Sequence, residues 1–204
     1  DAVGVVFMFA PAHHVAMRHA IGPRRELGLR TIFNILGPIT NPAGVKRQLI
    51  GVFSAELCEP IVHVLKALGA EHVMVVHSDD GLDEISIATG TTVAELRDGT
   101  VSTYRITPGD FALVPRSLEG LTVASAEASA TLIRRVLGGE GDEIARKAAD
   151  LIALNAGATI YVSGIAATLA DGVAMAEDLL ASGQAGEKLK EFIDFTRMMR
   201  DTAH

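Results

Sequence analysis

An acidic run, GLDEIS at residues 81–86, contains side chains that could do chemistry, and it begins shortly after the apolar run 72–77. Two adjacent carboxylates on a turn can both face a hard cation. Mg²⁺ commonly takes one or two carboxylates together with waters and substrate phosphates. The run follows a segment that we expect to be a parallel strand, where α/β proteins collect their sites. Asp83 and Glu84 are therefore candidate magnesium ligands, with a solvated acidic turn as the simpler interpretation.

A basic run and a histidine pair near the start of the chain could bind an anionic ligand. Residues 24–30 read RRELGLR, and an arginine can hold a carboxylate through two hydrogen bonds. A solvated helix face with an internal ion pair is the alternative. His13 and His14 are adjacent, so they would project about 100° apart on a helix and cannot form an i, i+4 metal pair. Either could be a pocket donor, and capping or surface roles are the alternatives.

An alternating pattern of strands and helices must position these side chains. Residues 48–53 and 72–77 read as buried strands, and residues 56–68 between them read as an amphipathic helix with Ser54 as its cap and Gly69 as its stop. This order predicts a β-α-β unit with a parallel strand pair. Two further runs alternate around a turn of sequence RDGT and predict a hairpin at the edge of the sheet. They are residues 91–96 and 101–106.

The sequence after Pro115 is helical in pattern. Glycine-containing segments separate the predicted helices, among them Asn155-Ala156-Gly157. The predicted helices are residues 125–137, 142–154, 165–181 and 187–199.

The net charge, the length of the apolar runs and the cysteine count exclude several classes of protein. The formal net charge of the 204-residue chain is −7, whereas a general nucleic-acid binder is usually basic. No apolar run approaches the roughly 20 residues of a membrane-spanning helix. The single cysteine, Cys58, cannot form an internal disulfide and is expected to be a buried, inert thiol. We therefore expect a cytoplasmic protein without nucleic-acid or membrane partners.

Several runs of the sequence resemble anthranilate phosphoribosyltransferases. FAPAHHVAM at residues 9–17, RRELGLRTIFNILGP at 24–38 and TNPA at 40–43 resemble the family's signature around the anthranilate pocket, and residues 81–86 resemble its metal segment. Weaker matches occur in the helical C-terminal part. The resemblance implies the α/β part of such an enzyme. Its fold would be a central, largely parallel mixed sheet flanked by helices, of the nucleoside phosphorylase/phosphoribosyltransferase type.

The resemblance also implies roles for individual residues. Arg24 would contact the anthranilate carboxylate, and His14 and Pro38 would line the same pocket. Asp83 and Glu84 would hold Mg²⁺ against the diphosphate of phosphoribosyl pyrophosphate (PRPP). The amine of anthranilate is itself the nucleophile, so no covalent enzyme intermediate is needed and no residue is assigned a catalytic role.

Motifs that the family normally carries are not found in these 204 residues. They are a glycine-rich Gly-Thr-Gly-Gly-Asp loop, an Asn-x-Ser-Thr segment and a Lys-His-Gly-Asn loop. We therefore expect residues 1–204 to form one α/β domain of a longer two-domain enzyme that also has an N-terminal helical domain. That enzyme would be a homodimer, and this chain alone would have little activity. The alternatives are a pyrimidine nucleoside phosphorylase-like enzyme and a non-catalytic nucleic-acid-binding relative, the latter disfavoured by the acidic charge.

Overall fold

The computed structural model describes residues 2–8, 37, 39, 41 and 43–202. A single mixed sheet organises this part of the chain, in the order β1-β2-β3-β4. The strands are β1 (Arg47–Gly51), β2 (His72–Ser78), β3 (Thr91–Arg97) and β4 (Thr100–Ile106). β1 and β2 are parallel, and β2–β3 and β3–β4 are antiparallel. The predicted parallel pair and the predicted edge hairpin are thus confirmed, and the mixed sheet agrees with the expected fold class.

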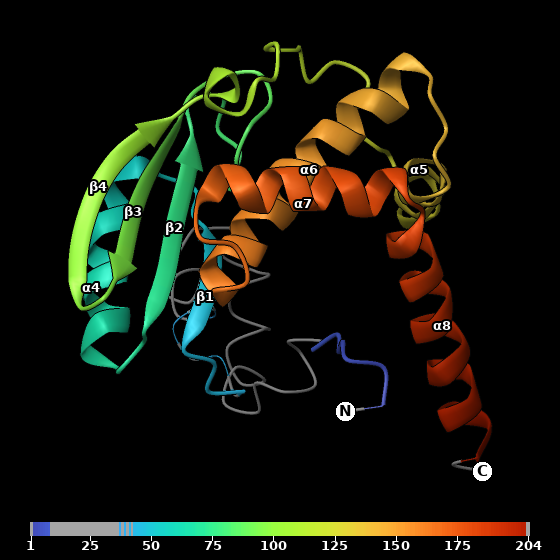
Figure 1. The fold of residues 1–204 in the computed structure, drawn as a ribbon, viewed down its shortest axis with the longest axis horizontal. Coiled ribbons are helices and arrows are strands. Elements are labelled where there is room, and N and C mark those ends of the chain that lie inside the picture. Colours follow the sequence, from blue (N-terminus) through green and yellow to red (C-terminus); the bar gives the residue numbers. More distant parts are fainter. Residues whose placement is uncertain (1, 9–36, 38, 40, 42, 203–204) are drawn as a thin grey trace, which may run out of the picture.

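Helices cover both faces of the sheet (Figure 1). Successive side chains of a strand point to opposite faces, so β2 has an apolar side chain for each layer. On one face, Val73 and Val75 pack with α4 (Cys58–Ala67), which follows a short 3-10 turn, η2 (Ala55–Leu57). On the other face, Met74 and Val76 pack with α6 (Glu143–Ser163) and α7 (Leu169–Ala181). Burial on both faces explains why β2 reads as a continuous apolar run.

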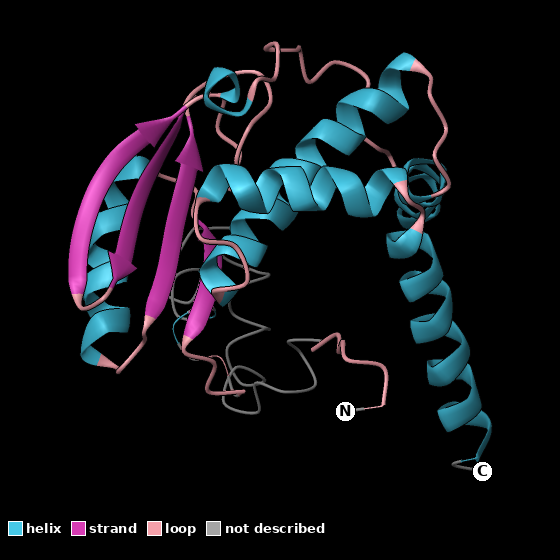
Figure 2. Cartoon of the chain, in the orientation of Figure 1, coloured by secondary structure: helices cyan, strands magenta, loops and turns pink. Residues whose placement is uncertain are grey.

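The remaining helical segments come after the sheet in the chain, and Figure 2 distinguishes the helices from the strands by colour. They are the 3-10 turn η3 (Pro108–Phe111) and the helices α5 (Ala126–Leu137) and α8 (Gln184–Thr202). Hydroxyl and carboxylate caps begin three of the helices, since the side chains of Ser125, Asp142 and Thr168 accept hydrogen bonds from first-turn amides. α8 has no buried residue and extends away from the sheet in Figure 1. No helix in the described residues is long and apolar enough to cross a membrane.

Two predicted helix boundaries are wrong. α6 continues through the predicted break at Asn155-Ala156-Gly157 and ends at Ser163, where Gly164 adopts a left-handed conformation with φ 86°. The break does not occur because Gly157 lies at a close crossing of two helices. A Cβ at Gly157 would lie 2.5 Å from the Cα of Val173 on α7. The predicted helix 165–181 begins only at Leu169.

The caps around α4 were predicted in part. Gly69 follows the helix with φ 86°, as expected of a glycine stop. Ser54 occupies the N-cap position of η2, but its side chain makes no capping hydrogen bond. The helical segment begins as the 3-10 turn η2.

Candidate functional site

The predicted metal residues lie in the loop between β2 and β3, beside the end of β1. Asp83 and Glu84 are both exposed. The backbone of Asp83 packs directly on Gly51, the last residue of β1, because a Cβ on Gly51 would lie 1.5 Å from the carbonyl oxygen of Asp83. Only a glycine permits so close an approach of two backbones. The end of β1 is thus shaped to seat the acidic loop.

Asn155 of α6 fixes the residue that follows the two acids. Its Oδ1 accepts a hydrogen bond from the amide nitrogen of Ile85 at 2.9 Å, and its Nδ2 donates to the carbonyl oxygen of Ile85 at 3.0 Å. The same Nδ2 donates to the carbonyl oxygen of Leu151 one turn earlier at 3.0 Å. One side chain therefore connects the helix layer to the acidic loop and satisfies both backbone groups of a buried residue.

A buried group of hydroxyls holds the loop from the side of the sheet. Ser78, at the end of β2, donates through Oγ to the carbonyl oxygen of Glu84 and lies 2.7 Å from the hydroxyl of Thr91 on β3. The amide nitrogen of Ser86 donates to Ser78 Oγ at 3.1 Å. The backbone on both sides of the acidic pair is thus fixed by neighbours on β2, β3 and α6.

The four acids of this loop fall into two pairs with different roles. Asp79 forms an ion pair with Arg105 of β4, which holds the pKa of that carboxyl below its usual value. Asp80 accepts hydrogen bonds from Ser86 Oγ and from the amide of Leu82, so it shapes the turn.

Asp83 and Glu84 differ from these two acids. Their carboxylates have no hydrogen-bond or ion-pair partner within the part of the chain that the structure describes. They are the acids of the loop that the fold leaves available to a ligand.

The electrostatics of this free pair favour a cation. Although Glu84 is exposed as a residue, partial desolvation of its carboxyl raises its pKa, and the negative charge of Asp83 raises it further. A bound cation would offset both effects, since an opposite charge favours the ionised carboxylate. Two carboxylates also match the few protein ligands that Mg²⁺ takes when it shares waters and phosphates. Within the described residues, no group of three or more His, Cys, Asp or Glu side chains that could hold a metal ion is found.

The three residues predicted to form the anthranilate pocket lie outside the described residues. These are Arg24, His14 and Pro38. His77, which the sequence analysis did not select, is described: its Nδ1 lies 2.8 Å from the carbonyl oxygen of Val52. This contact ties the end of β2 to the residue after β1.

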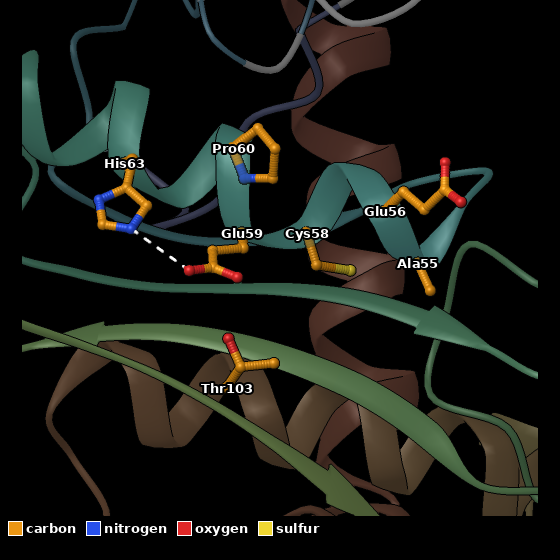
Figure 3. A pocket seen from close by; sticks show the side chains of 7 residues that line it. All are labelled: Ala55, Glu56, Cys58, Glu59, Pro60, His63 and Thr103. Atoms are coloured by element: carbon orange, nitrogen blue, oxygen red, sulfur yellow. Dashed lines mark ion pairs between the residues drawn. The ribbon is translucent and has the colours of Figure 1, made fainter.

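A pocket of about 530 Å³ between α4 and β4 is lined by Cys58 together with Glu59 and His63 (Figure 3). Cys58 is 1% exposed, and burial raises the pKa of its thiol to about 11. The thiol is therefore protonated near neutral pH, which agrees with the inert role expected from the sequence. Glu59 and His63 on the same wall lie 3.7 Å apart and pair with each other.

Two residues that position the acidic loop were missed by the sequence analysis. Gly51 interrupts an apolar strand, and an isolated glycine in a strand indicates a bulge or a close backbone approach. Asn155 stands in a helical pattern, where asparagine is unfavourable unless its side chain has a local or tertiary partner. Both signals are present in the sequence, but neither identifies the acidic loop as the segment that Gly51 or Asn155 contacts.

Comparisons with known proteins identify the family of this chain. The family model described as "Glycosyl transferase family, a/b domain" matches residues 1–186. The chain is 62% identical over 198 residues to an anthranilate phosphoribosyltransferase of Cellvibrio japonicus, covering 97% of this chain and 58% of that protein. A relative of the same name from Acinetobacter baumannii is 56% identical over 200 residues, covering 98% of this chain and 57% of its own length.

Solved structures show the same similarity in three dimensions. The anthranilate phosphoribosyltransferase of Thermus thermophilus matches with a TM-score of 0.86 and 41% identity, over 96% of this chain and 57% of that one. The Saccharomyces cerevisiae enzyme in complex with PRPP and Mg matches with a TM-score of 0.80 and 31% identity, over 93% of this chain and 54% of that one. The chain therefore spans little more than half the length of the relatives that it matches.

Proposed function

This chain belongs to the glycosyl transferase family through its a/b domain. We propose that it is part of an enzyme that transfers the 5-phosphoribosyl group of PRPP to anthranilate in tryptophan biosynthesis. The proposal concerns the whole protein, because the chain spans 58% of the length of its Cellvibrio japonicus relative. The observation that supports it best is the free carboxylate pair of Asp83 and Glu84, in a loop whose other two acids are already bound.

In the proposed reaction, the lone pair of the anthranilate amine attacks the anomeric carbon of the ribose. The bond from that carbon to the diphosphate oxygen breaks, pyrophosphate leaves, and the amine releases one proton. Asp83 and Glu84 would hold Mg²⁺, which when bound neutralises negative charge on the leaving diphosphate. The loop contacts described above keep the two carboxylates together, so little reorganisation is needed when the diphosphate binds.

The anthranilate end of the site is proposed from the sequence resemblance alone. Arg24 would hold the anthranilate carboxylate through two hydrogen bonds, and His14 and Pro38 would form the wall of the pocket. We propose further that residues 1–204 are a single α/β domain of a two-domain enzyme, and that this enzyme is a cytoplasmic homodimer.

The test is the PRPP-dependent loss of anthranilate fluorescence in the full-length protein, measured at increasing Mg²⁺. Asp83→Asn or Glu84→Gln should raise the Mg²⁺ concentration needed for half-maximal rate by at least about tenfold, since even indirect partners of a metal contribute this much. Arg24→Ala should raise the KM for anthranilate and leave the Mg²⁺ requirement unchanged. Asp178→Asn, at an exposed position of α7, is the matched control and should behave like the parent protein.

A second measurement addresses the pyrimidine nucleoside phosphorylase alternative. The same protein is incubated with phosphate and uridine or thymidine, and release of the free base is followed. Base release without any consumption of anthranilate would replace the transferase proposal. An unchanged Mg²⁺ requirement in both carboxylate variants would instead remove Asp83 and Glu84 from the site.

A further inference from the structure

A second polar pocket lies at the opposite end of the sheet from the acidic loop. β2 begins there and β3, which runs antiparallel to it, ends there, as the opposed arrows in Figure 1 show. The pocket has a volume of about 580 Å³ and is lined by residues from β1, β2, the β3–β4 turn and the end of α6. The proposed transfer reaction uses none of these residues.

A buried carboxylate organises the wall of this pocket. Glu95 of β3 accepts hydrogen bonds from the hydroxyls of Tyr161 at 2.8 Å and Tyr104 at 2.7 Å, and its Oε1 lies 2.8 Å from Nε2 of His72. A carboxylate only accepts hydrogen bonds, so Nε2 carries the proton in this contact. The rings of His72 and Tyr161 also meet edge to face, with centroids 4.9 Å apart. The network fixes both rings in one orientation.

Two arginines are held at the pocket through this wall. Arg97 donates to the hydroxyl of Tyr161 at 2.7 Å, and its guanidinium lies 5.3 Å from the centre of that ring. Arg47 donates to the carbonyl oxygen of Val162 at 3.2 Å and passes beside Gly164, where an added Cβ would lie 3.0 Å from its Nη1. Each guanidinium is thus anchored by one N–H group and retains others for a ligand.

His72 also lines this pocket, on the strand between those that carry Arg47 and Arg97. The residue is 6% exposed and lines the pocket, and its Nδ1 has no hydrogen-bond partner among the described residues. The donors that the wall offers to an occupant are therefore the two guanidinium groups.

Two acids on the rim compete for the arginines. Glu71 lies 3.6 Å from Arg47, and Asp98 lies 3.6 Å from Arg97. The side chain of Glu71 is 50% exposed and that of Asp98 is 93% exposed, and ion pairs in water contribute little. An oxyanion that enters the pocket can form shorter, bidentate contacts with the same guanidinium groups.

We propose that this pocket is a binding site for a small oxyanion, a carboxylate or a phosphate group, held by Arg47 and Arg97 with His72 between them. The volume suits a small metabolite and exceeds that of an inorganic ion. The site lies apart from the acidic loop, so it does not depend on the proposed transfer reaction.

The test is an NMR titration of the full chain labelled with ¹⁵N, using inorganic phosphate and succinate in separate experiments at constant ionic strength. We expect saturable shifts centred on the amides of His72, Gly99 and Gly164 with at least one of the two anions. Saturation with phosphate alone identifies a phosphate site, and saturation with succinate alone identifies a carboxylate site. If neither anion gives saturable shifts there, the proposal is wrong.

Variants decide whether the arginines are responsible. Arg97→Gln and Arg47→Gln should each weaken binding by about tenfold, the loss expected when one charged hydrogen bond is removed. Arg200→Gln is the matched control, since Arg200 is an exposed arginine paired with an acid on α8. Equal weakening in the control would overturn the proposal. If far-UV circular dichroism shows that Arg97→Gln is unfolded, Arg47→Gln and Arg97→Lys provide the same comparison.

Discussion

At the residue scale, the acidic loop depends on neighbours that carry no charge. Asn155 makes two hydrogen bonds to Ile85, beside Glu84, and the end of β1 accepts the loop only because Gly51 has no side chain. These contacts fix the backbone, and no described residue forms a hydrogen bond or an ion pair with the carboxylate of Asp83 or Glu84. Metal affinity in such a loop should respond to uncharged substitutions as well as to removal of an acid.

Asn155→Ala tests this dependence. The variant leaves the amide and the carbonyl oxygen of the buried Ile85 without their partner. We expect the free energy of unfolding to fall by about 1–3 kcal/mol and the Mg²⁺ affinity to fall by about tenfold. Urea denaturation and calorimetric Mg²⁺ titration measure the two effects. Thr159→Ala, one turn further along α6 and exposed, should change stability by less than about 0.5 kcal/mol. Unchanged Mg²⁺ affinity in Asn155→Ala would show that the loop holds its shape without the asparagine.

The tyrosines around Glu95 lead to a prediction at high pH. Burial and the hydrogen bond to Glu95 raise the pKa of Tyr104 and Tyr161 above their ordinary value, although Arg97 partly lowers that of Tyr161. A group whose pKa is raised on folding stabilises the fold below its unfolded pKa, about 10 for tyrosine. This stabilisation is lost as the pH rises towards the folded pKa. We therefore expect the free energy of unfolding to fall above about pH 10.

The chain is well suited to this measurement, because it has two tyrosines and no tryptophan. Phenolate absorbance then reports only Tyr104 and Tyr161. In the folded protein, neither should ionise near its ordinary pKa, and phenolate should form together with the loss of far-UV circular dichroism. Tyr104→Phe should make the alkaline loss of stability less steep. Ionisation of both tyrosines near pH 10 in a protein that is still folded would contradict the buried network.

At the scale of elements, the crossing of α6 and α7 depends on two glycines. A Cβ on Gly157 would lie 2.5 Å from the Cα of Val173, and a Cβ on Gly172 would lie 2.3 Å from the carbonyl oxygen of Gly157. Backbone atoms cannot move aside as a flexible side chain can, so the helices would have to separate. Since α6 also carries Asn155, separation of the helices would disturb the acidic loop.

Gly157→Ala should therefore destabilise the protein, even though alanine favours a helix over glycine by about 1 kcal/mol. We expect a loss of about 1–3 kcal/mol from overpacking, measured by urea denaturation. Gly141→Ala is the matched control, because a Cβ there meets nothing within 4 Å. The control should be neutral or slightly stabilising. A gain in stability for Gly157→Ala would show that the two helices are not held so closely.

The elements differ in how closely their bounds follow from the local sequence. The strands and the hairpin were predicted within a few residues because buried strands have a local pattern of apolar residues. The apolar run is continuous in β2, and a turn separates the runs of β3 and β4. Asn155-Ala156-Gly157 read as a helix break because both glycine and asparagine have low helix propensity. Contacts with α7 and with Ile85 explain why these residues stand inside a helix. Such contacts join distant parts of the chain, and no local pattern records them.

The candidate site shows the same limit. The acids were predicted because two adjacent carboxylates after a strand are visible in the sequence. Which of the acids have partners could not be predicted, since this depends on the ion pair of Arg105 with Asp79 and on the hydrogen bond from Ser86 to Asp80. Pocket-lining residues at the other end of the sheet were likewise missed, because Arg47, Arg97 and His72 lie on three different strands.

At the scale of the whole molecule, metal binding and turnover should separate. Among the described residues, Gly51, Ser78, Thr91 and Asn155 hold the acidic loop. Residues 1–204 should therefore bind Mg²⁺ weakly and lose that binding on Asp83→Asn. The glycine-rich diphosphate loop that the family resemblance implies is not found in this sequence, so the reacting groups would be poorly aligned. Misplacement by about 1 Å can already slow a reaction about 100-fold.

We therefore expect residues 1–204 to consume anthranilate at least about 100-fold more slowly than the full-length protein. Anthranilate fluorescence with PRPP and Mg²⁺ compares the two proteins, and calorimetry measures Mg²⁺ binding to each. Robust turnover by residues 1–204 would mean that this domain alone aligns the diphosphate and the amine. Loss of both turnover and Mg²⁺ binding, in a chain that retains its far-UV circular dichroism, would mean that the acidic loop needs contacts from elsewhere in the protein. Binding without turnover would assign the metal loop to this domain and the alignment of the substrates to the rest of the enzyme.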